Sequence, residues 1–159
     1  MADDTYRVER SITIDAPPAR VYEQIADFHH WRNWSPWEDI DPEQKHTYSG
    51  AASGTGAVYT WSGNRKVGQG RMEITNATEP SKVDVDLLFE RPWKARNDAA
   101  FSIEPAGSGS RVTWSITGKK TFMTRLMGLF KSMDKMLGPD FEKGLARLKA
   151  AVEAPTTST

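Results

Sequence analysis

The sequence predicts an α+β fold, in which a curved antiparallel sheet of about six to seven strands wraps around a long C-terminal helix, with two short helices after the first strand. Three observations lead to this prediction. Apolar residues recur with the period of one helical face between Thr121 and Ala154. Shorter segments before that stretch alternate apolar and polar residues, as half-buried strands do. Short turns rich in glycine and proline separate these segments, which favours an antiparallel meander.

The first element that we expect is a half-buried strand at residues 6–14. Its apolar side is formed by Val8, Ile12 and Ile14. Arg10 is a polar residue that shares this apolar side. The run from Asp15 to Pro18 ends the strand and starts a helix, because proline is tolerated in the first helical turn. A short second helix or coil then holds three tryptophans: Trp31, Trp34 and Trp37.

Alternation predicts the remaining strands between residues 45 and 117. They are expected at residues 45–50, 57–62, 67–77, 83–90, 99–104 and 111–117. Gly68 and Gly70 lie inside one of them. Two glycines within a strand predict a bend, a bulge or the close approach of a bulky group.

The C-terminal helix is expected to cover the apolar face of this sheet. Burial of each large side chain contributes roughly 1.5–3 kcal/mol, so the apolar stripe of the helix gives the dominant packing term. Pro139 lacks the amide that would bond to the preceding turn, and we therefore expect either one bent helix or two nearly collinear ones around Gly138. A curved sheet rarely closes tightly onto one rod, and we expect a cavity between the two.

Composition excludes several classes of protein. The 21 basic and 21 acidic residues balance, which removes the electrostatic basis for nucleic-acid binding. Without cysteine, the chain has no disulfide, thiolate nucleophile or cysteine-bound metal. No apolar run approaches the roughly 18 residues of a membrane span, and the polar N-terminus is not a signal peptide. We expect one cytoplasmic domain over residues 6–153, without stable membrane insertion and with flexible ends at 1–5 and 154–159.

The sequence contains no motif that assigns metal or cofactor chemistry. The only histidines are His29, His30 and His46, and their spacing does not match a metal site. A nucleophile elbow, a phosphate-cradling loop and a dinucleotide fingerprint are also missing from the sequence. We therefore expect neither a metal nor a cofactor, and we assign no catalytic residue.

Five segments carry a resemblance to a known group of proteins. They are the opening RSITIDAPPARVYEQIADFHHWRNWSPW (10–37), GTGAVYTWSG (54–63), VGQGRMEI (67–74), SRVTWSITG (110–118) and MLGPDFEKGLARLKAAVE (136–153). The chain resembles the START-like, or helix-grip, superfamily (SRPBCC) from about Tyr6 to Glu153, and looks most similar to small bacterial polyketide cyclase/dehydratase-like proteins. The resemblance implies the fold predicted above. It leaves several functions open, since this superfamily includes ligand carriers, hormone receptors, cyclases, dioxygenase subunits and Hsp90-activating domains.

We expect the cavity to bind a small hydrophobic or aromatic molecule, such as a polyketide-, lipid- or isoprenoid-like ligand. Three polar residues are candidates for orienting it: Arg10, Tyr59 and Asn97. The apolar candidates for its walls are Trp37, Trp61, Met72, Leu87, Phe89, Phe101, Trp114, Met123, Met127 and Phe130. Methionine adapts to ligands of varied shape, although each of these side chains also suits an ordinary core.

Two alternative functions fit the same resemblance. One is a polyketide cyclase or dehydratase that works without metal, although no catalytic motif of such enzymes can be matched to positions in this chain. The other is a protein-interaction module similar to Hsp90-activating domains, with exposed tryptophans in the segment 31–37 as the contact. Open sheet edges also allow a homodimer.

Overall fold

The computed structural model describes residues 5–36, 43–63, 68–91, 95–119 and 132–153. Its seven strands are β1 (Thr5–Ile14), β2 (Lys45–Gly50), β3 (Ala57–Ser62), β4 (Gln69–Thr78), β5 (Lys82–Arg91), β6 (Ala95–Ala106) and β7 (Gly109–Lys119). They form one antiparallel sheet in the order β1-β7-β6-β5-β4-β3-β2. The described helices are α1 (Pro18–Ala26), the 3-10 helix η1 (Phe28–Asn33) and α3 (Ser132–Glu153). The predicted fold class is confirmed.

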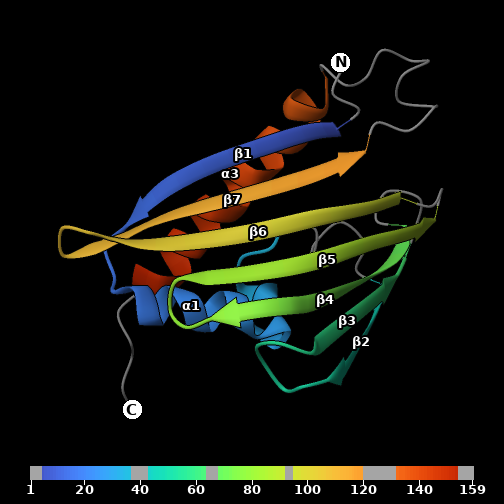
Figure 1. Ribbon diagram of the computed structural model, residues 1–159, viewed down its shortest axis with the longest axis horizontal. Helices are drawn as coiled ribbons and strands as arrows, with labels where there is room; N and C mark the ends of the chain where they lie inside the picture. Colours follow the sequence, from blue (N-terminus) through green and yellow to red (C-terminus); the bar gives the residue numbers. More distant parts are fainter. Residues whose placement is uncertain (1–4, 37–42, 64–67, 92–94, 120–131, 154–159) are drawn as a thin grey trace.

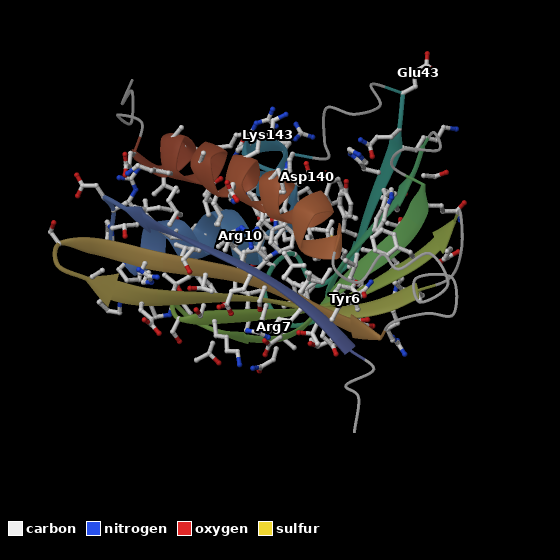
Figure 2. All side chains as sticks on the ribbon, turned by 90° about the horizontal axis from the view of Figure 1, so that it is seen from above. Tyr6, Arg7, Arg10, Glu43, Asp140 and Lys143 are labelled. Atoms are coloured by element: carbon white, nitrogen blue, oxygen red, sulfur yellow. The ribbon has the colours of Figure 1, made fainter. Side chains whose placement is uncertain are left out.

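All of these helices cover the same face of the sheet, which we call the inner face (Figure 1). From β2 to β7 each strand lies beside its neighbour in sequence, while β1 pairs with β7 at one edge. The chain leaves β1 at that edge, runs through α1 and η1, and reaches β2 at the other edge. Figure 2 shows that the sheet curves, so that β2 turns toward the side on which α3 lies.

Helix α3 continues through Pro139 without a break in the described residues. Of the two predicted arrangements, the single helix is therefore the one observed. Residues 121–131, which the apolar pattern assigned to the same helix, lie outside the described part. The described part of α3 packs mainly on β1, with smaller contacts to β7, α1 and η1. Its Phe141 and Leu145 are buried against the sheet.

Aromatic rings fill the middle of the inner face. Trp34 is fully buried, and its ring lies edge-on to the rings of Phe101 and Trp114. Trp114 stacks on Phe141 of α3, with ring centroids 4.1 Å apart and planes inclined by 3°. The core thus joins η1, β6, β7 and α3. Because η1 reaches the centre of the sheet, it covers an area that the sequence pattern assigned to the C-terminal helix.

The tryptophans of η1 and the residue after it do not form an exposed surface. Trp31 is 4% exposed and Trp34 is 0% exposed. Their indole N–H groups donate to the backbone oxygens of Ile25 and Gln24 in α1. The expectation that they contact a protein partner is therefore wrong, because apolar burial against the sheet takes both rings out of solvent. Trp37 lies outside the described residues.

Candidate functional site

The strand registers arrange the inner face into rows that cross the sheet. One row is buried along its length and consists of Val8, Ile116, Ala99, Val85 and Ile74, none of them more than 7% exposed. The next row, toward the start of β1, consists of Tyr6, Gly118, Asn97, Leu87, Met72, Tyr59 and Tyr48. Four side chains of this second row are half-buried: Tyr6, Leu87, Met72 and Tyr48. The fully packed core therefore ends within the second row, in which Gly118, Asn97 and Tyr59 are still buried.

A third, shorter row continues the half-buried area. It consists of Phe89, Gly70, Trp61 and His46. Trp61 and Phe89 are both half-buried, and their rings meet edge to face with centroids 5.7 Å apart. We call Tyr48, Trp61, Met72, Leu87 and Phe89 the half-buried patch. It spans β2 to β5, and each of its side chains is partly exposed to solvent.

Gly70 explains how Trp61 lies in this patch. A Cβ atom built on Gly70 would lie 2.5 Å from Cη2 of Trp61, so the indole occupies the space above the glycine. The register of β4 against β5 also shifts between Gln69 and Gly70. Both features match two of the predicted alternatives, a bulge and the close approach of a bulky group, at Gly70. Gly68 lies outside the strand, because β4 begins at Gln69.

The polar candidate Asn97 lies in the second row and is 4% exposed. Its Oδ1 accepts a hydrogen bond of 2.6 Å from the hydroxyl of Tyr6. Burial raises the pKa of Tyr6 to about 12, so this phenol keeps its proton across the physiological range. Asn97 is thus a buried amide whose oxygen is held by a neutral donor.

The other polar candidates have structural partners. Nε of Arg10 donates to Oε2 of Glu142 at 2.9 Å, and Nη1 donates to the backbone oxygen of Glu9. The guanidinium also lies against Gly138, so Arg10 is positioned between β1 and α3, beneath the helix in Figure 2. Tyr59 is 6% exposed, and its ring contacts four neighbouring rings: Phe28, His46, Tyr48 and Trp61.

The structure divides the predicted apolar wall into two groups. Trp61, Met72, Leu87 and Phe89 come together in the half-buried patch, next to Tyr59 and Asn97. Phe101 and Trp114 instead lie in the packed core, at 0% and 3% exposure. The remaining predicted wall residues lie outside the described part: Trp37, Met123, Met127 and Phe130.

Three residues of the second row were not among the predicted site residues: Tyr6, Tyr48 and Gly118. Tyr6 shares the strand side of Val8 and Arg10, and Tyr48 shares the side of His46. The two-residue period of a strand was therefore the signal that identifies both tyrosines. The role of Gly118 depends on the pairing of β7 with two other strands, which local pattern does not give.

Comparison with known proteins then assigns the family. The model of the family described as polyketide cyclase/dehydrase and lipid transport matches residues 5–153. The chain belongs to this family. No curated protein matches the sequence. Family membership agrees with the resemblance seen in the sequence and accounts for the sheet and C-terminal helix described above.

Solved structures share the fold at low sequence identity. A protein from Thermus thermophilus is 20% identical with a TM-score of 0.69, covering 95% of this chain and 99% of its own. The Aha1 dimer from Colwellia psychrerythraea is 17% identical with a TM-score of 0.63, covering 94% and 98%. DynU16, from the dynemicin biosynthetic locus, is 14% identical with a TM-score of 0.64, covering 96% of this chain and 48% of its own. At these identities the similarity concerns the fold alone.

None of the described helices combines the length and hydropathy that crossing a membrane requires. Among the described residues, no three His, Asp or Glu side chains lie close enough together to hold a metal ion.

Proposed function

We propose that this protein binds a small hydrophobic or aromatic molecule against the half-buried patch on the inner face of its sheet. One observation carries the proposal: every residue in the row of Val85 is buried, whereas the next inward-facing row also contains half-buried side chains, namely Tyr6, Leu87, Met72 and Tyr48. An apolar ligand would remove this surface from water, which favours binding in proportion to the area covered.

The test compares two neighbouring leucines of β5. Leu87 belongs to the patch, whereas Leu88 faces the other side of the sheet, opposite Arg71 and Arg96. The probe is 1-anilinonaphthalene-8-sulfonate, followed by its fluorescence, with circular dichroism to check folding. We expect saturable binding that Leu87→Asp weakens at least ~10-fold, since a buried leucine contact is lost and a charge is introduced. Leu88→Asp should leave the affinity within about twofold.

Two outcomes would contradict the proposal. One is no saturable binding by the folded wild-type protein, and the other is equal weakening by both leucine variants.

Native mass spectrometry of protein purified from its own host, followed by denaturing release, then identifies the molecule that it carries. A stoichiometric apolar adduct is the expected result.

The alternative function is a polyketide cyclase or dehydratase. It draws on the description of the family and on the presence of His46 and Tyr59 in the rows of the patch, with ring centroids 5.2 Å apart. Both are residue types that act as general acids or bases. Turnover of a linear polyketide-like substrate that is lost in His46→Gln and Tyr59→Phe, with ligand binding retained, would favour the enzyme over the carrier.

A homodimer is part of the same proposal. β2 lies at an edge of the sheet, with β3 as its only strand neighbour in the described sheet, and edge strands can pair with a second copy. The Aha1 structure from Colwellia psychrerythraea is a dimer with this fold. Light scattering after size exclusion should give twice the chain mass, and a mass equal to one chain at micromolar concentration would contradict the dimer.

A further inference from the structure

Among the described residues of the inner face, Asn97 is a buried residue whose amide donor makes no hydrogen bond to protein. Asn97 is 4% exposed, and its Oδ1 is occupied by the hydroxyl of Tyr6. Among the described residues, Nδ2 of Asn97 donates no hydrogen bond. On the side away from Tyr6, the next residue of the row is Leu87, followed by Met72. Neither offers a strong acceptor to the amide.

The local geometry holds this amide in a fixed orientation. β7 runs between β1 and β6, and Gly118 is the register partner of both Tyr6 and Asn97. A Cβ atom on Gly118 would overlap Oδ1 of Asn97 and would lie 2.8 Å from Cε1 of Tyr6. The two side chains therefore meet above a residue that has no side chain. Figure 2 shows Tyr6 near the start of β1, away from Arg10 beneath α3.

The donor lies beside the half-buried patch. Asn97 and Leu87 are direct register partners on β6 and β5, so a molecule that covers Leu87 and Met72 reaches the amide. Nδ2 of Asn97 keeps some access to solvent, and an oxygen atom supplied by a ligand would take the place of water as its acceptor. No lysine or arginine occurs in the row from Tyr6 to Tyr48. A carboxylate lying along this row would meet no cationic side chain of the row itself.

We propose that Nδ2 of Asn97 is the specificity contact of this face, donating to a neutral carbonyl or hydroxyl oxygen of an otherwise apolar ligand. Tyr6 acts as the positioning residue, since its hydroxyl fixes Oδ1 and thereby turns Nδ2 toward the ligand. The inference rests on the proposed binding function and narrows its ligand class to uncharged oxygenated molecules, in preference to fatty-acid carboxylates.

Three naphthalene probes of similar shape test this assignment. 2-Acetylnaphthalene offers a carbonyl, 2-ethylnaphthalene has a methylene in its place, and 2-naphthoate carries a carboxylate. Displacement of 1-anilinonaphthalene-8-sulfonate gives the three dissociation constants. The wild-type protein should bind 2-acetylnaphthalene about 3–10-fold more tightly than 2-ethylnaphthalene, the range of one net hydrogen bond, and more tightly than 2-naphthoate.

Variants at Asn97 and Tyr6 separate the loss of the amide donor from a general loss of structure. Asn97→Asp keeps an acceptor for Tyr6 but removes the donor, and Asn97→Leu removes both. Each should lower the preference for 2-acetylnaphthalene over 2-ethylnaphthalene to about one, while binding of 2-ethylnaphthalene persists in Asn97→Leu. Tyr6→Phe should reduce the preference partly. Asn76→Leu, on the exposed side of β4, is the matched control and should leave it unchanged.

The different failures are distinguishable. Equal binding of the acetyl and ethyl probes by the wild-type protein, or an unchanged preference in Asn97→Asp, would overturn the role of Asn97 and leave the apolar binding function standing. Failure of all three probes to bind the folded wild-type protein would overturn both. The ratio of two affinities is the readout because a purely structural loss lowers both affinities together.

Discussion

Trp114 shows how one side chain was assigned to the wrong part of the face. It lies on the side of its strand that was predicted to line the ligand cavity. Its ring nevertheless stacks on Phe141, and its ring centroid lies 5.0 Å from the ring centroid of Phe101. It is 3% exposed, so its contacts are with protein. Strand period gives the face of a side chain, whereas the depth of burial depends on what packs above it.

We therefore expect Trp114→Ala to lower the free energy of unfolding by about 3–5 kcal/mol, the range for a large aromatic residue removed from a core. Trp61→Ala should cost less stability, since Trp61 is already half-buried, but should weaken binding of the apolar probe. Urea denaturation and probe titration measure the two effects. Equal losses of stability in both variants would contradict the division of the inner face into core and patch.

Tyr6 gives a second prediction at the scale of one residue. Burial raises its pKa to about 12 from the ordinary value of 10.0. The folded state then holds the proton more tightly than the unfolded state, so this contribution to stability is complete below pH 10 and is lost as the pH rises through about 12. An ultraviolet titration follows the ionisation of the four tyrosines. The difference between the curves of the wild type and Tyr6→Phe should be one phenol that loses its proton near pH 12. A difference centred near pH 10 would contradict this.

At the scale of an element, α3 approaches β1 closely because a glycine faces the strand. Gly138 is buried, and a Cβ atom built on it would overlap the guanidinium of Arg10. The same guanidinium bonds to Glu142, one helical turn further along α3. Ordinary helix propensity would favour alanine at position 138 by about 0.5–1 kcal/mol. Tertiary contact therefore outweighs propensity at this position.

A double-mutant cycle tests this account of the helix contact. Gly138→Ala should destabilise the wild-type protein by about 1–3 kcal/mol through overpacking. In an Arg10→Ala background the same substitution should become neutral or stabilising, because the overlapping group is gone. Thermal or urea unfolding gives both values. An identical effect in the two backgrounds would show that Arg10 does not set the space above Gly138.

At the scale of the whole molecule, the two edges of the sheet differ in their cover. β1 is an edge strand on which α3 packs, whereas β2 has no comparable helix contact among the described elements. Hydrogen exchange should therefore be slowest in β6 and β7, intermediate in β1 and fastest in β2. Binding of an apolar probe should slow exchange in β3 to β5 and leave β7 unchanged. Protection of β2 equal to that of β1 would contradict this arrangement.

The sequence by itself determined the period of each element and hence the fold class. Strand alternation placed Val8, Val85 and Ile116 on one face, and the apolar stripe identified a C-terminal helix. Alternation also placed four further residues on that face, as the structure confirms: Met72 beside Leu87, and Trp61 beside Phe89. These properties follow from local geometry, because a side chain's direction depends only on its position within its own strand or helix.

Only the tertiary structure decided which part of the inner face is covered by other elements and therefore buried. Trp31 of η1 and Trp34, the residue after it, pack on Phe101, and Trp34 also packs on Trp114. The pairing of β1 with β7 brings Tyr6 to Asn97, 91 residues away in sequence, above Gly118. Burial and buried hydrogen bonds depend on contacts between distant segments, which periodicity does not encode. The sequence therefore determined which residues face inward, while the packing of distant elements decided which of them form the core and which remain half-buried.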